Sequence, residues 1–234
     1  LCLDKAVLGA AGSFEIKGSV SPTSTGGGII SFLHLGRKDG PETRMDINIV
    51  YRTSDASLEA TLDFHEAPRG WTATVLGYAE AGGIDVSLDG SGPLDDWKGM
   101  LSAEVPSVGS LKSEISVKAV GETKIGVEGA YLPAGAGSPP LMTRVLPSGV
   151  RFAVDGAISG LRLVTMERVE FTGEDFHFKS SGKVDLESGA MEGLWELEAP
   201  VLQRLEPLLE TPLEGKLTAG GTVSSSSLHD ASGT

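Results

Sequence analysis

The chain has 234 residues, and its 32 acidic side chains against 19 basic ones give a formal net charge of −13. Recognition of nucleic-acid phosphates needs clustered Lys and Arg, so this charge excludes a nucleic-acid partner. Cys2 is the only cysteine, which excludes an intramolecular disulfide framework and a cysteine-based metal site. No run reaches the roughly 18 consecutive apolar residues of a membrane-spanning helix. We therefore expect a chain that is soluble as given, or an excerpt of a protein anchored elsewhere.

Alternation of apolar and polar residues is the main pattern, as in Asp85–Asp89 and Glu114–Lys118. A β-strand sends successive side chains to opposite faces, so this pattern predicts strands with one apolar face. Short turns such as Lys38–Pro41 separate the segments and favour antiparallel neighbours. The expected fold class is all-β: a long antiparallel meander curled into an elongated hydrophobic groove. Strands are expected at 13–17, 45–51, 58–64, from residue 84, and at 97–105, 111–120, 124–132, 150–158, 161–171, 175–186, 191–199 and 213–223.

Three segments interrupt the alternation and predict short helices near residues 68–78, 139–147 and 201–209. No clear domain boundary is visible, so residues 1–223 are expected to form one continuous β-segment. Residues 224–234 are polar and are expected to be a frayed end.

Two similar phrases hint at an internal repeat. Glu66–Pro68 and Glu198–Pro200 each end an expected strand and begin an expected helix. Ordered repetition of this kind favours an elongated, repeat-like structure over one compact core.

The sequence lacks the usual catalytic patterns. No two of the histidines have the i, i+4 spacing of a helical zinc motif; they are His34, His65, His177 and His229. Asp175 and His177 share a face of an expected strand and could orient a base, but no nucleophile motif accompanies them. Glu196 and Glu198 are more typical of a solvated strand face than of a glycosidase. We therefore expect a non-enzymatic protein without metal or cofactor.

A sheet with one apolar face must bury that face against a second sheet, inside a barrel or around a guest. A compact β-sandwich is one possibility. Three Trp and three Tyr are too few for the aromatic girdles of a membrane barrel. An open trough lined by aliphatic side chains suits the composition and would hold acyl chains, at about 0.8 kcal/mol per buried methylene.

Several phrases resemble the periplasmic region of the TamB family, the translocation and assembly module proteins within the AsmA-like group of bridge-like lipid-transfer proteins. They are Glu66–Trp71 with Leu76–Gly77, Leu88–Gly99, and Gly182–Leu186 followed by Gly193–Leu197. The resemblance extends over nearly the whole chain.

The resemblance implies a long sheet folded lengthwise into a groove in the periplasm of a Gram-negative bacterium. It further implies a full-length protein with an N-terminal anchor in the inner membrane and a TamA-like outer-membrane barrel as partner. Neither the anchor nor the TamA contact can be located in this chain. The implied activity is movement of phospholipid between the membranes, or assistance to outer-membrane protein assembly.

Our leading hypothesis is a groove for phospholipid acyl chains. The runner-up is a scaffold or chaperone that holds outer-membrane strands through an exposed sheet edge. The residues expected to line the groove are Val86, Leu88, Ile115, Val117, Ile125, Val127, Val154, Ile158, Leu163, Phe176, Phe178, Trp195 and Leu197.

Overall fold

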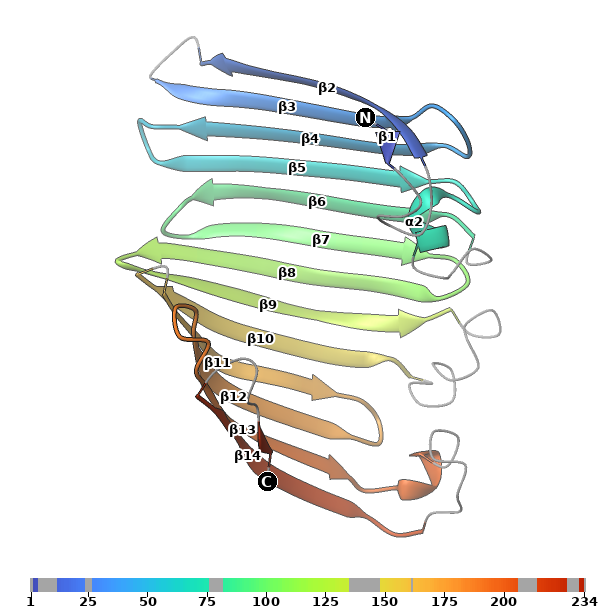
Figure 1. Ribbon diagram of the computed structural model, residues 1–234, viewed down its shortest axis with the longest axis vertical. Coiled ribbons are helices and arrows are strands. Elements are labelled where there is room, and N and C mark those ends of the chain that lie inside the picture. The colour runs from blue at the N-terminus through green and yellow to red at the C-terminus, as the bar shows by residue number, and fades with distance from the viewer. Residues whose placement is uncertain are drawn as a thin grey trace. The chain divides into compact units, whose positions relative to one another are not determined.

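The computed structural model describes residues 2–3, 12–23, 27–75, 82–134, 148–160, 162–205, 214–226 and 232–233. Most of these residues lie in β-strands, and the strands follow one another in the sheet in chain order (Figure 1). The pairings are antiparallel, as the short connections of the sequence favour. The expected fold class, an all-β antiparallel meander of the kind that curls into a groove, is therefore confirmed.

A strand occurs at each expected segment, and the strand Trp97–Val105 has the expected bounds. The strands Cys2–Leu3, Gly28–Arg37 and Ser232–Gly233 lie outside the expected segments, and the last of them lies in the range expected to be frayed. The strands are β1 (Cys2–Leu3), β2 (Gly12–Pro22), β3 (Gly28–Arg37), β4 (Thr43–Arg52), β5 (Ser57–Glu66), β6 (Ile84–Pro93), β7 (Trp97–Val105), β8 (Gly109–Val120), β9 (Glu122–Pro133), β10 (Val150–Ser159), β11 (Leu163–Thr172), β12 (His177–Asp185), β13 (Met191–Ala199), β14 (Leu217–Ser225) and β15 (Ser232–Gly233).

The chain divides into two compact units. The first unit comprises Leu1–Lys112 and Ala134–Pro139, and the second comprises Ser113–Pro133 and Pro140–Thr234. The first unit thus contains β2 to β7, the second contains β9 to β14, and β8 is divided between them.

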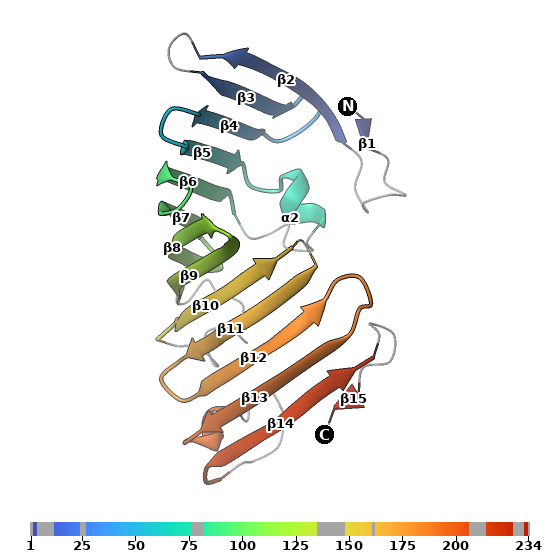
Figure 2. The ribbon, with the colours of Figure 1, turned by 90° about the vertical axis from the view of Figure 1, so that its left-hand side faces the viewer.

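Two of the three expected helices lie among the described residues. Helix α2 (Trp71–Val75) falls inside the expected range 68–78, and the 3₁₀-helix η2 (Leu202–Leu205) falls inside 201–209. The helix expected at 139–147 lies outside the described residues. Within the part of the chain that is described, no helix is long and apolar enough to span a membrane. In Figure 2, α2 lies beside one end of the strands of the first unit.

Little of the described chain is fully buried. The buried apolar side chains are Phe14, Ala73, Trp97, Ala157 and Ala199. Large apolar side chains such as Val20 and Ile29 are instead exposed, at 72% and 50%. The hydrophobic surface of the sheet is therefore only partly covered, and its distribution over the two faces defines the candidate site.

Candidate functional site

The strand register separates the first unit into an apolar and a polar face. Residues paired across antiparallel strands share a face, so each row of paired residues crosses the sheet on one side. Two neighbouring rows of one face are almost wholly aliphatic. The first is Ile16, Leu35, Met45, Phe64, Val86 and Ala103, and the second is Gly18, Leu33, Ile47, Leu62, Leu88 and Leu101. We call this side the apolar face of the first unit.

Helix α2 covers one margin of this apolar face. Glu66, at the end of β5, is fully buried and lies opposite Thr43 in the register. Its carboxylate accepts hydrogen bonds from the backbone amides of Thr72 (2.8 Å) and Ala73 (2.9 Å) and from the Thr43 hydroxyl (3.1 Å). Otherwise unpaired amides at the start of a helix are thereby satisfied. Glu66 thus fixes α2 over the end of the strands.

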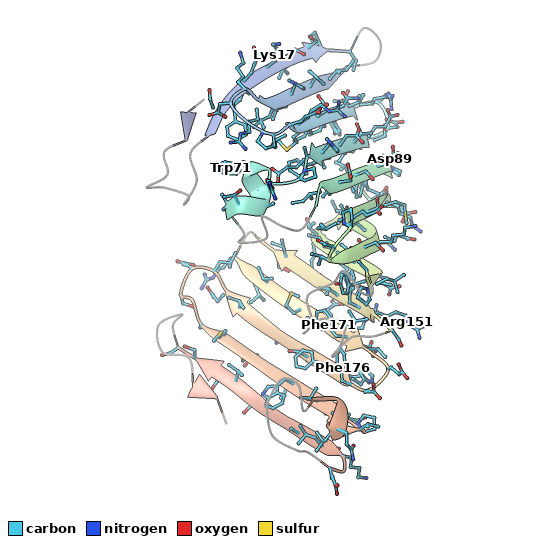
Figure 3. The ribbon with its side chains drawn as sticks, turned by 90° about the vertical axis from the view of Figure 1, so that its right-hand side faces the viewer. Lys17, Trp71, Asp89, Arg151, Phe171 and Phe176 are labelled. Carbon is cyan, nitrogen blue, oxygen red and sulfur yellow. The ribbon has the colours of Figure 1, made fainter. Side chains whose placement is uncertain are left out.

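The approach of α2 to the sheet is close. The Trp71 ring meets the Phe14 ring edge-on at a centroid distance of 5.5 Å (Figure 3). A Cβ at Gly70 would lie 2.1 Å from Glu66 Cγ, so only glycine fits at that point of the turn. Arg69, one residue earlier, has a φ of 61°. The sequence Glu66–Trp71 is therefore a specific turn that places a short helix on the apolar face.

Trp97 covers a second part of the same face. Its indole lies over the cross-strand pair Gly90 and Gly99, because a Cβ at Gly90 would be 2.1 Å from Trp97 Cζ2. The indole nitrogen Nε1 donates to the Leu58 carbonyl oxygen at 3.0 Å. With a residue exposure of 6%, Trp97 is a fixed part of the sheet and not a mobile surface side chain.

The second unit also has an apolar face, and aromatic side chains are prominent on it. Phe171 lies 6.4 Å from Phe152 and 6.2 Å from Phe178, measured between ring centroids, in one row across three strands (Figure 3). That row is Gly129, Phe152, Phe171, Phe178, Leu197 and Ala219. The neighbouring row continues the apolar surface with Val127, Val154, Val169, Ser180, Trp195 and Gly221.

Most of the predicted lining residues lie on the apolar face of their own unit. Val86 and Leu88 belong to the first unit. The others lie in the second unit and share a face by register: Ile125, Val127, Val154, Ile158, Phe178, Trp195 and Leu197. Phe176 precedes β12 and packs on the same side, since a Cβ at Gly173 would be 2.4 Å from its Cε1. None of these side chains is fully buried.

Ile115 and Val117 of β8 also fall on this side of the second unit. A Cβ at Gly126 would lie 2.7 Å from Ser116 Oγ and 3.1 Å from a carboxylate oxygen of Asp155, so Ser116 points to the face opposite the aromatic row. The residues on either side of Ser116 in the strand therefore point toward the apolar face.

Leu163 is the exception. It pairs with Ser159 and Asp185, which places it on the polar face, whereas its neighbour Val164 lies on the apolar one. A β-bulge at Glu167–Arg168 explains the difference, because two residues of β11 oppose one residue of β12 there. The extra residue changes the phase of alternation, so the pattern around Phe171 does not extend back to Leu163. The assignment of Leu163 to the apolar lining was wrong.

The polar faces carry paired charges. The three histidines that the structure describes each contact a carboxylate on a neighbouring strand: His34 with Asp46 at 2.6 Å, His65 with Asp85 at 2.6 Å and His177 with Glu170 at 2.7 Å. His177 thus contacts Glu170 of the neighbouring strand on the polar face. Among the described residues, no group of three or more potential metal ligands occurs.

Arg168, at the bulge, lies within reach of three carboxylates, those of Glu128, Asp155 and Glu170. Its guanidinium donates to Asp155 Oδ2 at 2.6 Å and to Glu128. Both hydrogen bonds raise the pKa of Arg168 above its ordinary value, and the bond to Glu128 has the larger effect. The cluster keeps this side of the sheet hydrated and charged.

Three adjoining hollows follow β11 to β14 in the second unit, with volumes of about 600, 630 and 430 Å³. The 600 Å³ hollow shares Lys183, Glu192 and Ser224 with the 630 Å³ hollow, and it shares Ser181 and Leu194 with the 430 Å³ hollow. By register these residues alternate with the apolar row, so the hollows open on the polar face. Leu163 and Trp195 border them.

Sequence reasoning missed two residues that shape the first-unit face, Glu66 and Trp97. The strand pattern could have identified Ile47 and Leu62, which alternate in the same way as Val86 and Leu88. No local signal marks Glu66 as buried, since its position beneath α2 depends on its contact with Thr43, which is more than twenty residues away in the sequence.

Comparisons with protein-family models, with curated proteins and with solved structures found no match for the chain. The geometry of the two apolar faces is therefore the basis for a functional assignment.

Proposed function

We propose that this chain is a non-enzymatic lipid-carrying segment whose apolar sheet faces hold the acyl chains of phospholipid. The observation that carries the proposal is the pair of aliphatic rows in the first unit. Ile16 at its margin is 48% exposed, Gly18 is exposed, and the other members of the rows are half-buried. Burying such a surface against acyl chains contributes about 0.8 kcal/mol for each methylene removed from water.

The chemistry of the two faces supports a lipid as the guest. The side chains of the rows offer no hydrogen-bond donors or acceptors, so they favour a hydrocarbon guest. Contacts of this kind have no direction, so the guest is not fixed at one position along the sheet. The opposite faces carry ion pairs and hydroxyl groups and are suited to water. A contiguous apolar surface that remains partly exposed to solvent is typical of a binding surface.

The resemblance to the TamB family supports a location in the periplasm of a Gram-negative bacterium. In this proposal the full-length protein is anchored in the inner membrane and meets a TamA-like barrel through parts outside this chain. The phospholipid moves between the inner and outer membranes and so supports outer-membrane biogenesis.

The first test is native mass spectrometry of the purified chain after incubation with phospholipid vesicles, combined with a photo-cross-linking amino acid at Val117. We expect phospholipid adducts at Val117 and few at Lys118, the next residue of β8, which is exposed on the other side. Equal adducts at both positions, or none at either, would contradict the proposal. Adducts with unfolded barrel precursors in place of lipid would indicate a scaffold for outer-membrane proteins.

A charge on the apolar face should block binding. We expect Ile115→Arg to leave the strands folded and to lower phospholipid binding at least about tenfold, since a buried unpaired charge costs several kcal/mol. Glu114→Arg introduces the same side chain at the neighbouring, exposed position and should bind lipid normally. Circular dichroism checks the fold of both variants, and normal binding by folded Ile115→Arg would refute the assignment.

A further inference from the structure

We draw no further inference here: the strongest candidate, the adjoining hollows on the polar face along β11 to β14, is an open surface without a buried polar side chain among its lining residues, and nothing in the structure shows what ligand or partner occupies it.

Discussion

The two Glu-Ala-Pro phrases end strands in the two units, and they place their acidic side chains on opposite faces. Glu66 is fully buried on the apolar face of the first unit, beneath α2. Glu198 is exposed on the polar face of the second unit and pairs across strands with His177. In the second phrase it is Ala199, one residue later, that is fully buried. The same three-residue sequence therefore buries its glutamate in the first unit and its alanine in the second, because the residue that faces the apolar side is shifted by one position.

The cross-strand glycine pairs show a second difference between the units. Gly90 and Gly99 in the first unit lie beneath the indole of Trp97. Gly182 and Gly193 pair in the same way in the second unit, but the nearest atoms to their Cβ positions belong to the backbone. The glycine pair thus makes room for an indole ring in the first unit. In the second unit no side chain is among the atoms nearest to the Cβ positions of the glycine pair.

The largest expected effect separates the two glutamates. Glu66→Ala should lower the free energy of unfolding by about 3 kcal/mol, because two backbone amides of α2 and the Thr43 hydroxyl lose their acceptor. Glu198→Ala removes an exposed side chain and should change stability by less than about 0.5 kcal/mol. Urea denaturation followed by circular dichroism measures both. Equal denaturation midpoints for the two variants would show that α2 is not held by Glu66.

The glycine pairs give a smaller effect. Gly90→Ala should cost about 2 kcal/mol, because the new Cβ would lie 2.1 Å from the buried indole of Trp97, which is also held by its hydrogen bond to the Leu58 carbonyl oxygen. Gly193→Ala should cost less than about 1 kcal/mol, since its closest neighbour is the Ser181 carbonyl oxygen at 3.0 Å. Thermal denaturation of the two variants checks the order, and a larger loss for Gly193→Ala would reverse the comparison.

The sequence was sufficient for the strands because alternation is a local signal. It predicted the bounds of β7 and the face of residues such as Leu88 and Val127, which structure and register place as expected. It was less suited to positions where both faces are apolar. Ile29 and Ile30 on β3 are adjacent, point to opposite faces and are both exposed.

The rest depended on contacts that alternation does not encode. The bulge at Glu167–Arg168 changed the face of Leu163, and no residue type in that segment marks the bulge. The position of Trp97 over Gly90 requires the pairing of β6 with β7, and the burial of Glu66 requires both Thr43 and α2. These contacts join different strands, or a strand and a helix. The alternation pattern therefore predicts the apolar face but not the side chains that cover its margins.

The smallest expected effect concerns the turns, one in each unit, where an aspartate accepts local hydrogen bonds. In the second unit the amide of Ser188, the side chain of Arg162 and the amide of Glu187 hold the pKa of Asp185 below its ordinary value. In the first unit the hydroxyl and amide of Ser57 lower the pKa of Asp55. A lowered carboxyl pKa contributes stability above the ordinary value of about 3.9, and this contribution is lost as the pH falls through the folded-state pKa.

Asp185→Asn and Asp55→Asn should therefore each reduce the loss of stability measured between about pH 4 and pH 2, relative to the unaltered protein. The change should be slight, because both aspartates are solvated and water screens their charge. We expect it to be larger for Asp185, which also contacts the Arg162 guanidinium at 3.1 Å, and salt should reduce that excess. Thermal denaturation across this pH range, at low and high salt, measures both. An excess for Asp185 that salt does not change would assign its effect to the two turn amides and not to Arg162.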